Sequence, residues 1–214
     1  MSDEDRAKLA ELDEALARFE QQKRWSDFIR TLVAKADLVT DPQEKLDLLS
    51  RAGREYIERS ANQAEAIKCF EAVLEIDGNH PDALARLKDL YEKRRDWERL
   101  VRIRQREAEA LDGAEQLAHH LETARMATER VRKPELCIEL WKRVLDFDPD
   151  VPEAIGALVG LYERAREWAP LATVLERWTE QIAEPNELKT QLQKLGMLYA
   201  DKINDDEGAV RVFK

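Results

Sequence analysis

The chain has few residues that interrupt regular secondary structure, with seven glycines and seven prolines in 214 residues. It contains no glycine-rich loop of the kind that cradles phosphates, and none of its few serines lies in a glycine-rich nucleophile elbow. His119 and His120 are adjacent, so their rings point to different faces of a helix, and no Cys or Asp/Glu cluster completes a metal site around them. We therefore expect no catalytic residue, no metal and no cofactor.

Cysteines and long apolar runs are also scarce, and the 35 Lys and Arg residues are outnumbered by 45 Asp and Glu residues. The two cysteines, Cys69 and Cys137, stand at non-equivalent positions of related segments, which favours free thiols in a reducing compartment. No apolar run is long enough for a membrane span, and the N-terminal stretch is acidic, which predicts a cytoplasmic location without a membrane partner. The net charge of −10 argues against binding to nucleic acid, because that interaction needs a basic surface.

The composition instead favours helices, with 43% hydrophobic and 37% charged residues. Several helix starts are marked by a proline in the first turn; in Asp41-Pro42-Gln43-Glu44 a capping Asp precedes it. No strand pattern is found, so the predicted fold class is all-α. The expected helices span residues 3–21, 25–38, 42–58, 62–76, 80–93, 96–111, 114–130, 134–147, 151–165, 168–182, 185–202 and 206–214.

A long internal period organises these helices. Trp25, Trp97 and Trp168 lie 72 and 71 residues apart, and each opens a similar phrase. Phe70 recurs as Trp141 at an offset of 71, and again as Phe213. Such a period predicts a solenoid whose unit is two helical hairpins. We expect a single α-solenoid over residues 1–214, with hairpins at 3–38, 42–76, 80–111, 114–147, 151–182 and 185–214.

The segment Arg51-Ala52-Gly53-Arg54-Glu55-Tyr56, followed by Ala66, Phe70 and Leu74, resembles a tetratricopeptide repeat. The whole chain is similar to a divergent array of such repeats, and somewhat similar to half-a-tetratricopeptide arrays. The resemblance implies a right-handed superhelix whose concave face is lined by first helices and binds peptides or proteins. Two departures stand out. Arg125 and Thr128 replace the Gly and Tyr in the middle copy, and Leu100 and Leu171 stand where the family prefers Ala, which predicts looser packing.

Two groups of residues are candidate partner-binding sites. By family geometry, the groove is expected to contain Arg51, Arg54, Arg86, Asp89, His119, Glu122 and Lys194. A second group is a stripe at helical spacing, formed by Arg95, Arg99, Arg102 and Arg106. Its counterparts one period later are Arg166, Pro170, Thr173 and Arg177, so the repeat does not require the stripe. The favoured interpretation is a solvated face neutralised by Glu98, Glu107 and Glu109, and the alternative is a site for an acidic or phosphorylated partner segment.

The tryptophans invite a ligand-stacking interpretation, but their repetition favours packing within the hairpins. Trp178 has no counterpart and is expected to be partly covered. The expected function is a non-enzymatic protein-interaction scaffold that binds a protein or peptide, an acidic one being among the candidates. The alternatives are a self-assembling structural element and the recruiting or regulatory arm of a larger enzyme. The sequence stops within the second helix of a hairpin, which predicts a longer array or self-association through an open C-terminal end.

Overall fold

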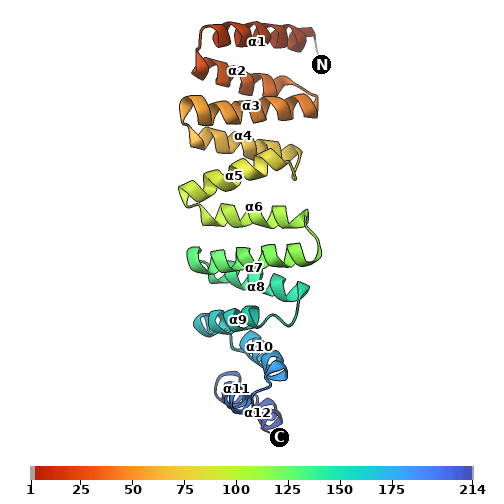
Figure 1. The fold of residues 1–214 in the computed structure, drawn as a ribbon, viewed down its shortest axis with the longest axis vertical. Coiled ribbons are helices and arrows are strands. Elements are labelled where there is room, and N and C mark those ends of the chain that lie inside the picture. The colour runs from red at the N-terminus through yellow and green to blue at the C-terminus, as the bar shows by residue number, and fades with distance from the viewer. Residues whose placement is uncertain (1–2, 214) are drawn as a thin grey trace. The chain divides into compact units, whose positions relative to one another are not determined.

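The computed structural model describes residues 3–213, and these residues form twelve α-helices, one short π-helix and no strand (Figure 1). The all-α prediction is confirmed. The elements are α1 (Asp3–Gln21), α2 (Trp25–Leu38), α3 (Pro42–Ser60), α4 (Gln63–Ile76), α5 (Pro81–Arg94), α6 (Trp97–Glu109), α7 (Gly113–Arg130), α8 (Pro134–Phe147), α9 (Pro152–Ala165), α10 (Trp168–Gln181), α11 (Pro185–Leu198), η1 (Tyr199–Ile203) and α12 (Asp206–Val212).

The helix boundaries follow the capping signals in the sequence. The carboxylate of Asp41 accepts a hydrogen bond from the backbone N–H of Glu44 at 2.8 Å, and Pro42 occupies the first turn of α3. The predicted helix 185–202 differs, because its last turn widens into the π-helix η1. There the carbonyl of Tyr199 accepts hydrogen bonds from the N–H groups of Asn204 and Asp205, and Asn204 takes a left-handed conformation that ends the element. Residue 214 of the last predicted helix lies outside the described residues.

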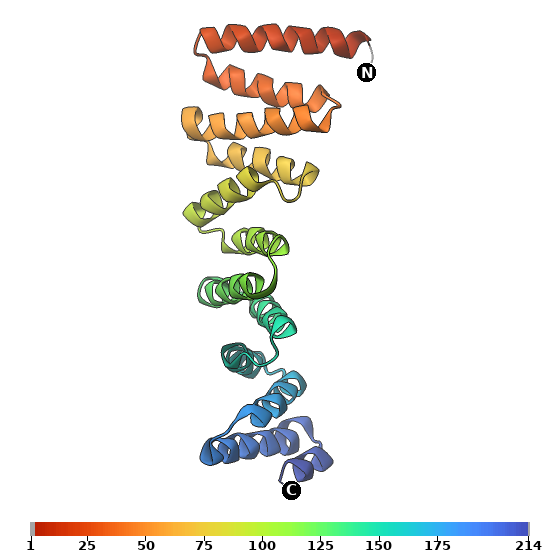
Figure 2. The same cartoon turned by 45° about the vertical axis from the view of Figure 1, so that its right-hand side comes forward.

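The chain divides into two compact units, Met1–Ala110 with α1 to α6 and Leu111–Lys214 with α7 to α12. Within each unit, consecutive helices pack against each other as hairpins (Figures 1 and 2). Each unit therefore contains three hairpins, and we call their members first and second helices. The single solenoid over residues 1–214 stays a prediction.

The centre of the second hairpin is a glycine packed under a phenyl ring. Gly53 of α3 lies so close to Phe70 of α4 that a Cβ on Gly53 would sit 2.8 Å from two ring carbons. Phe70 itself has no exposed surface. In the last hairpin, Gly196 and Phe213 repeat this contact, but there the phenyl ring is 60% exposed.

In the middle copy of the repeat, different residues occupy the place of Gly53 and Phe70, and one sequence-based expectation is wrong. Ala124, not Arg125, takes the place of Gly53, because the local offset is 71 rather than 72. Ala124 is fully buried, whereas Arg125 is exposed. The larger ring of Trp141 is accompanied by a small buried residue, Ala127, at the position of Tyr56. The indole N–H of Trp141 donates to the Thr128 hydroxyl at 2.8 Å, so its polar atom is satisfied.

The tryptophan hairpins share one connection. Lys23, Arg95 and Arg166 stand two residues before the three tryptophans, and their φ angles are 54°, 56° and 58°. In each turn, the N–H of the next residue bonds the carbonyl five positions earlier, as in a Schellman motif. Each tryptophan begins its helix and is half-buried, for example Trp25, which packs edge-on against Phe28 with the ring centroids 6.1 Å apart. The basic turn and the tryptophan therefore belong to the fold.

Other expectations about packing can be compared with the structure. Leu100 and Leu171 are both buried, and the looser packing of their helices stays a prediction. Trp178 is half-buried, with its ring next to Gly156 of α9. Cys69 and Cys137 are free and buried.

The predicted open end is partly apolar. In the last hairpin Met197, Val210 and Phe213 are 61%, 52% and 60% exposed. Self-association through this surface stays a prediction.

Candidate functional site

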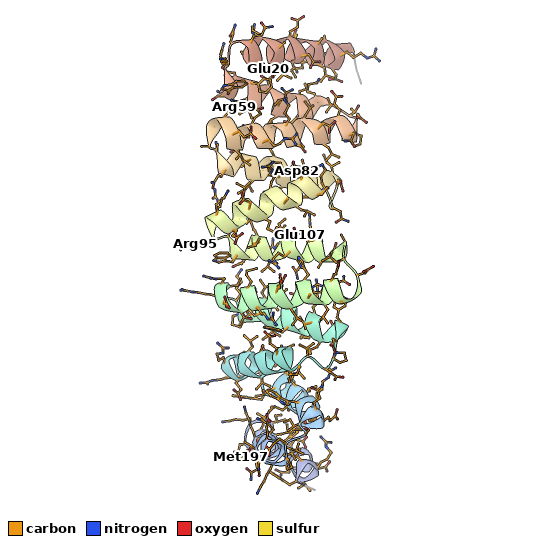
Figure 3. All side chains as sticks on the ribbon, viewed as in Figure 1. Glu20, Arg59, Asp82, Arg95, Glu107 and Met197 are labelled. Atoms are coloured by element: carbon orange, nitrogen blue, oxygen red, sulfur yellow. The ribbon has the colours of Figure 1, made fainter. Side chains whose placement is uncertain are left out.

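The cations predicted for the groove lie on first helices, and in unit 1 each has an acidic neighbour. Charged groups of α1, α3 and α5 form these contacts, and Figure 3 labels Glu20 and Asp82. The pairs are Arg51 with Glu20 at 2.9 Å, Arg54 with Asp82 at 3.4 Å, Arg86 with Asp82 at 3.3 Å, and Lys93 with Asp89 at 2.7 Å. The positive patch expected from Arg51, Arg54 and Arg86 is therefore largely neutralised by its own chain.

These pairs are also a property of the repeat. Arg54 and Asp82 recur 71 residues later as Arg125 and Glu153, which are joined by two hydrogen bonds of 2.6 and 2.5 Å. The hydrogen bonds from Arg125 lower the pKa of the Glu153 carboxyl. The ion pair of Glu163 with Lys194 in unit 2 repeats that of Glu20 with Arg51. His119 and Glu122, also expected in the groove, lie on α7 and have interactions of their own.

A second surface of unit 1 brings part of the arginine stripe together. A depression of about 370 Å³ lies between α4, α5 and α6. Its apolar floor and charged rim are formed by Glu71, Leu74, Glu75, Leu87, Tyr91, Arg99, Arg102, Ile103 and Arg106. We call it the arginine depression. Helix α6 places the three arginines on one side of it, because positions 99, 102 and 106 are spaced by about one and two helical turns.

One wall of the arginine depression is held by a three-residue contact. The Tyr91 hydroxyl donates to Glu71 Oε1 at 2.5 Å, and Arg99 Nη1 lies 3.5 Å from the same oxygen. The Arg99 guanidinium also sits 5.8 Å from the centre of the Tyr91 ring. Burial, and then the Glu71 carboxylate, raise the pKa of Tyr91 above its ordinary value. Arg99 is thus fixed in place by its own chain.

Arg102 and Arg106 differ from Arg99. Both are exposed, and neither makes an ion pair or hydrogen bond with any residue that the structure describes. Glu107, which was one of the acids expected to neutralise the stripe, pairs with Lys88 at 2.6 Å. Arg95 is not part of the depression, because it sits in the turn between α5 and α6 (Figure 3). The stripe is therefore reduced to three residues, two of which have unused donors.

Unit 2 contains a depression of about 290 Å³ at the equivalent place. Every residue that lines it stands 71 positions after a residue of the arginine depression: Lys142, Leu145, Asp146, Leu158, Tyr162, Pro170, Thr173, Val174 and Arg177. The shape is therefore a consequence of hairpin packing, in which two second helices leave a crevice above the first helix between them. The cluster of three arginines is not a consequence of this packing, because Arg177 is the only arginine at the three equivalent positions of unit 2.

Sequence reasoning identified the arginines but missed Glu71 and Tyr91. The signal was present, because Glu71 becomes Lys142 in the next copy and so differs between the copies as Arg99 does. It could not show that the three side chains meet, since they come from three different helices.

The Tyr91 contact predicts an alkaline sensitivity. A raised pKa in the folded state stabilises the fold fully below about pH 10, and this contribution is lost as pH rises from there through the folded-state pKa. Between pH 8 and pH 11, urea denaturation should show a larger loss of stability for the natural protein than for Tyr91→Phe. At pH 8 the variant itself should lose about 1 kcal/mol with the hydrogen bond. Equal pH profiles for the two proteins would contradict the assignment.

The described residues contain no cluster of three or more His, Cys, Asp or Glu side chains with the geometry of a metal site. None of their helices combines the length and the apolar character that crossing a membrane requires.

No sequence-family model and no curated protein matches this chain. Among solved structures, it is similar to a tetratricopeptide repeat protein from Parabacteroides merdae, with 12% identity over 95% of this chain and 77% of that one, and a TM-score of 0.41. It is also similar to MamA from Desulfovibrio magneticus RS-1, with 18% identity, 84% and 94% coverage, and a TM-score of 0.38. A third is pilF of Pseudomonas aeruginosa, with 14% identity, 98% and 89% coverage, and a TM-score of 0.38.

Several of the similar structures are tetratricopeptide proteins, the family that the residue pattern indicated. Their TM-scores lie below 0.5, so the description of this chain as an array of tetratricopeptide-like hairpins depends on its own contacts. The Gly53–Phe70 packing and its copy at Gly196 and Phe213 are the most specific of these.

Proposed function

We propose that this chain is a non-catalytic protein-interaction scaffold that binds an acidic segment of a partner protein in the arginine depression. The observation that carries the proposal is the pair Arg102 and Arg106, exposed beside an apolar floor and without acidic partners among the described residues. Guanidinium groups are strong donors to carboxylates, and unused ones on an otherwise acidic chain are available to a ligand. The two free, buried cysteines support a reducing, cytoplasmic location.

Binding at this surface has a defined physical character. The floor residues Leu74, Leu87 and Ile103 are almost fully buried, so the depression is shallow and most of its accessible lining is the charged rim. Affinity should therefore come mainly from charge-assisted hydrogen bonds, and it should fall as added salt screens them. The first-helix face is the competing surface, and its arginines must first leave Glu20 and Asp82.

Fluorescence anisotropy with a set of labelled peptides of about 12 residues, made of Asp, Glu, Leu and Ser, tests the proposal. The double variant Arg102→Glu/Arg106→Glu should weaken binding by about tenfold or more, because it reverses both unused charges. The matched variant Arg51→Glu/Arg54→Glu reverses two charges on the first-helix face and should change affinity by less than about twofold. Circular dichroism of each variant establishes that it is folded.

The other outcomes are equally informative. If only Arg51→Glu/Arg54→Glu weakens binding, the partner uses the first-helix face, as the family resemblance implies, and the arginine depression is not the site. If no acidic peptide binds at high protein concentration, the proposal of an acidic partner segment fails.

A further inference from the structure

We infer that the arginine depression selects a phosphorylated side chain over an ordinary carboxylate. This inference rests on the proposed function, since it names the anionic group within the acidic segment. Three observations carry it: the number of unused donors on Arg102 and Arg106, the anchoring of Arg99, and the difference between the arginine depression and its counterpart in unit 2.

The first argument is a match of donors to acceptors. Each guanidinium has five N–H donors, and a carboxylate has two oxygens that a single arginine can occupy in a two-pronged contact. Arg102 and Arg106 lie four residues apart on α6, so their side chains are neighbours on one helical face. A phosphoryl group has three terminal oxygens and a charge of about −1.5 to −2, and it can accept from both arginines at once. The pair therefore suits a phosphoryl group better than a carboxylate.

The second argument concerns the remaining charges on the rim. The Glu71 carboxylate is already engaged by the Tyr91 hydroxyl and by Arg99. Glu75 is the other acid on the rim, and it forms no ion pair with either Arg102 or Arg106. The two unused arginines face one free acid, so the outer rim has a surplus of positive charge. Arg99 offsets the charge of Glu71, and it would not have to be ordered on binding, because Glu71 and the Tyr91 ring already hold it.

The third argument is the comparison with unit 2. There the same crevice has the same kind of floor, with Leu145, Leu158 and Val174. The positions of Arg99 and Arg102 are taken by Pro170 and Thr173, which leaves Arg177 without a neighbouring guanidinium on α10. Hairpin packing therefore makes the crevice without requiring a pair of arginines. The unit 2 depression serves as a built-in control that has the shape without the pair of neighbouring arginines.

The test uses the full chain and four labelled peptides of about 12 residues that differ at one central position. That position is phosphoserine, phosphotyrosine, glutamate or serine. Anisotropy titrations should show at least one phosphorylated peptide binding about tenfold more tightly than the glutamate peptide. The variant Arg102→Thr copies the unit 2 residue and should reduce this preference to less than about twofold. A phosphorus NMR signal of the bound peptide should shift with the natural protein and shift much less with Arg102→Thr.

A second substitution guards against a trivial loss of folding. Arg177→Glu lies on the equivalent helix of unit 2 and should leave the phosphopeptide affinity unchanged. Thermal unfolding of both variants should match that of the natural protein within a few degrees, because Arg102 is exposed and Arg177 is only partly buried.

Each remaining outcome overturns a specific statement. If the glutamate and phosphorylated peptides bind equally and both are lost in Arg102→Glu/Arg106→Glu, the acidic-segment proposal holds and the phosphoryl preference is wrong. If a single-stranded RNA of about 12 nucleotides displaces the phosphopeptide and loses binding in the same variant, the site recognises nucleic acid phosphates instead. If none of the four peptides binds, both proposals fail.

Discussion

Replacing Phe70 with alanine is expected to lower the free energy of unfolding of unit 1 by about 3–5 kcal/mol. The ring is fully buried, and Gly53 leaves no Cβ that could move in to fill the space. Its neighbours on α3 and α4 belong to the closely packed second hairpin, so the cavity would collapse only in part. Urea denaturation followed by tryptophan fluorescence and by circular dichroism measures the change.

The last hairpin supplies a matched control for this substitution. Phe213 occupies the same position over Gly196 but is 60% exposed, so Phe213→Ala should cost about 1 kcal/mol or less. The two variants delete the same atoms from the same kind of hairpin and differ mainly in burial. Equal losses of stability would show that the glycine–phenyl contact, rather than burial, determines the energy.

Gly53→Ala is expected to destabilise unit 1 by about 1–2 kcal/mol, although alanine is the better helix former. The added methyl group would lie 2.8 Å from two carbons of a ring that cannot swing into solvent. Such overpacking costs about 1–3 kcal/mol, and the helix propensity of alanine returns about 0.5–1 kcal/mol of it. The melting temperature and the urea midpoint should both fall.

The same substitution at Gly160 of α9 is expected to change stability in the opposite direction. A methyl group there would meet only the end of the Arg164 side chain, at 3.7 Å. Gly160→Ala should therefore stabilise unit 2 by about 0.5–1 kcal/mol, because the propensity gain has no steric cost to offset it. If both substitutions stabilise, the contact of Gly53 with Phe70 is looser than the structure indicates.

Most of the fold could be predicted from the sequence because its signals are local. First-turn prolines, capping residues and a 71-residue period fixed the helix boundaries, usually within two residues. The predicted register of the middle copy is wrong by one residue, because it matches Arg125 to Gly53 at an offset of 72 instead of 71. Burial resolved it: Ala124 faces the core and Arg125 faces solvent. The π-helix at 199–203 was also missed, since nothing in helical periodicity distinguishes it from a continuing α-helix.

The candidate site was predictable only in part, because ion pairing depends on distances between helices. Sequence spacing placed Arg99, Arg102 and Arg106 on one face, and the structure brings them to one depression. Spacing could not show that Arg51 and Arg54 reach Glu20 and Asp82 on neighbouring first helices. Arginines at similar helical spacing thus differ in whether an acidic residue of the same chain already neutralises them.

The matching of contacts one period apart has a consequence for the length of the protein. Phe70 and Trp141 lie at equivalent points in the middle of α4 and α8. The residues that follow them, starting at Glu71 and at Lys142, pack onto α5 and α9 in the same manner. A chain that passed directly from Phe70 to Lys142 would thus join two compatible surfaces and create no new kind of interface. The fold is therefore compatible with removal or addition of whole 71-residue periods, whereas the charged residues around each crevice differ between the copies.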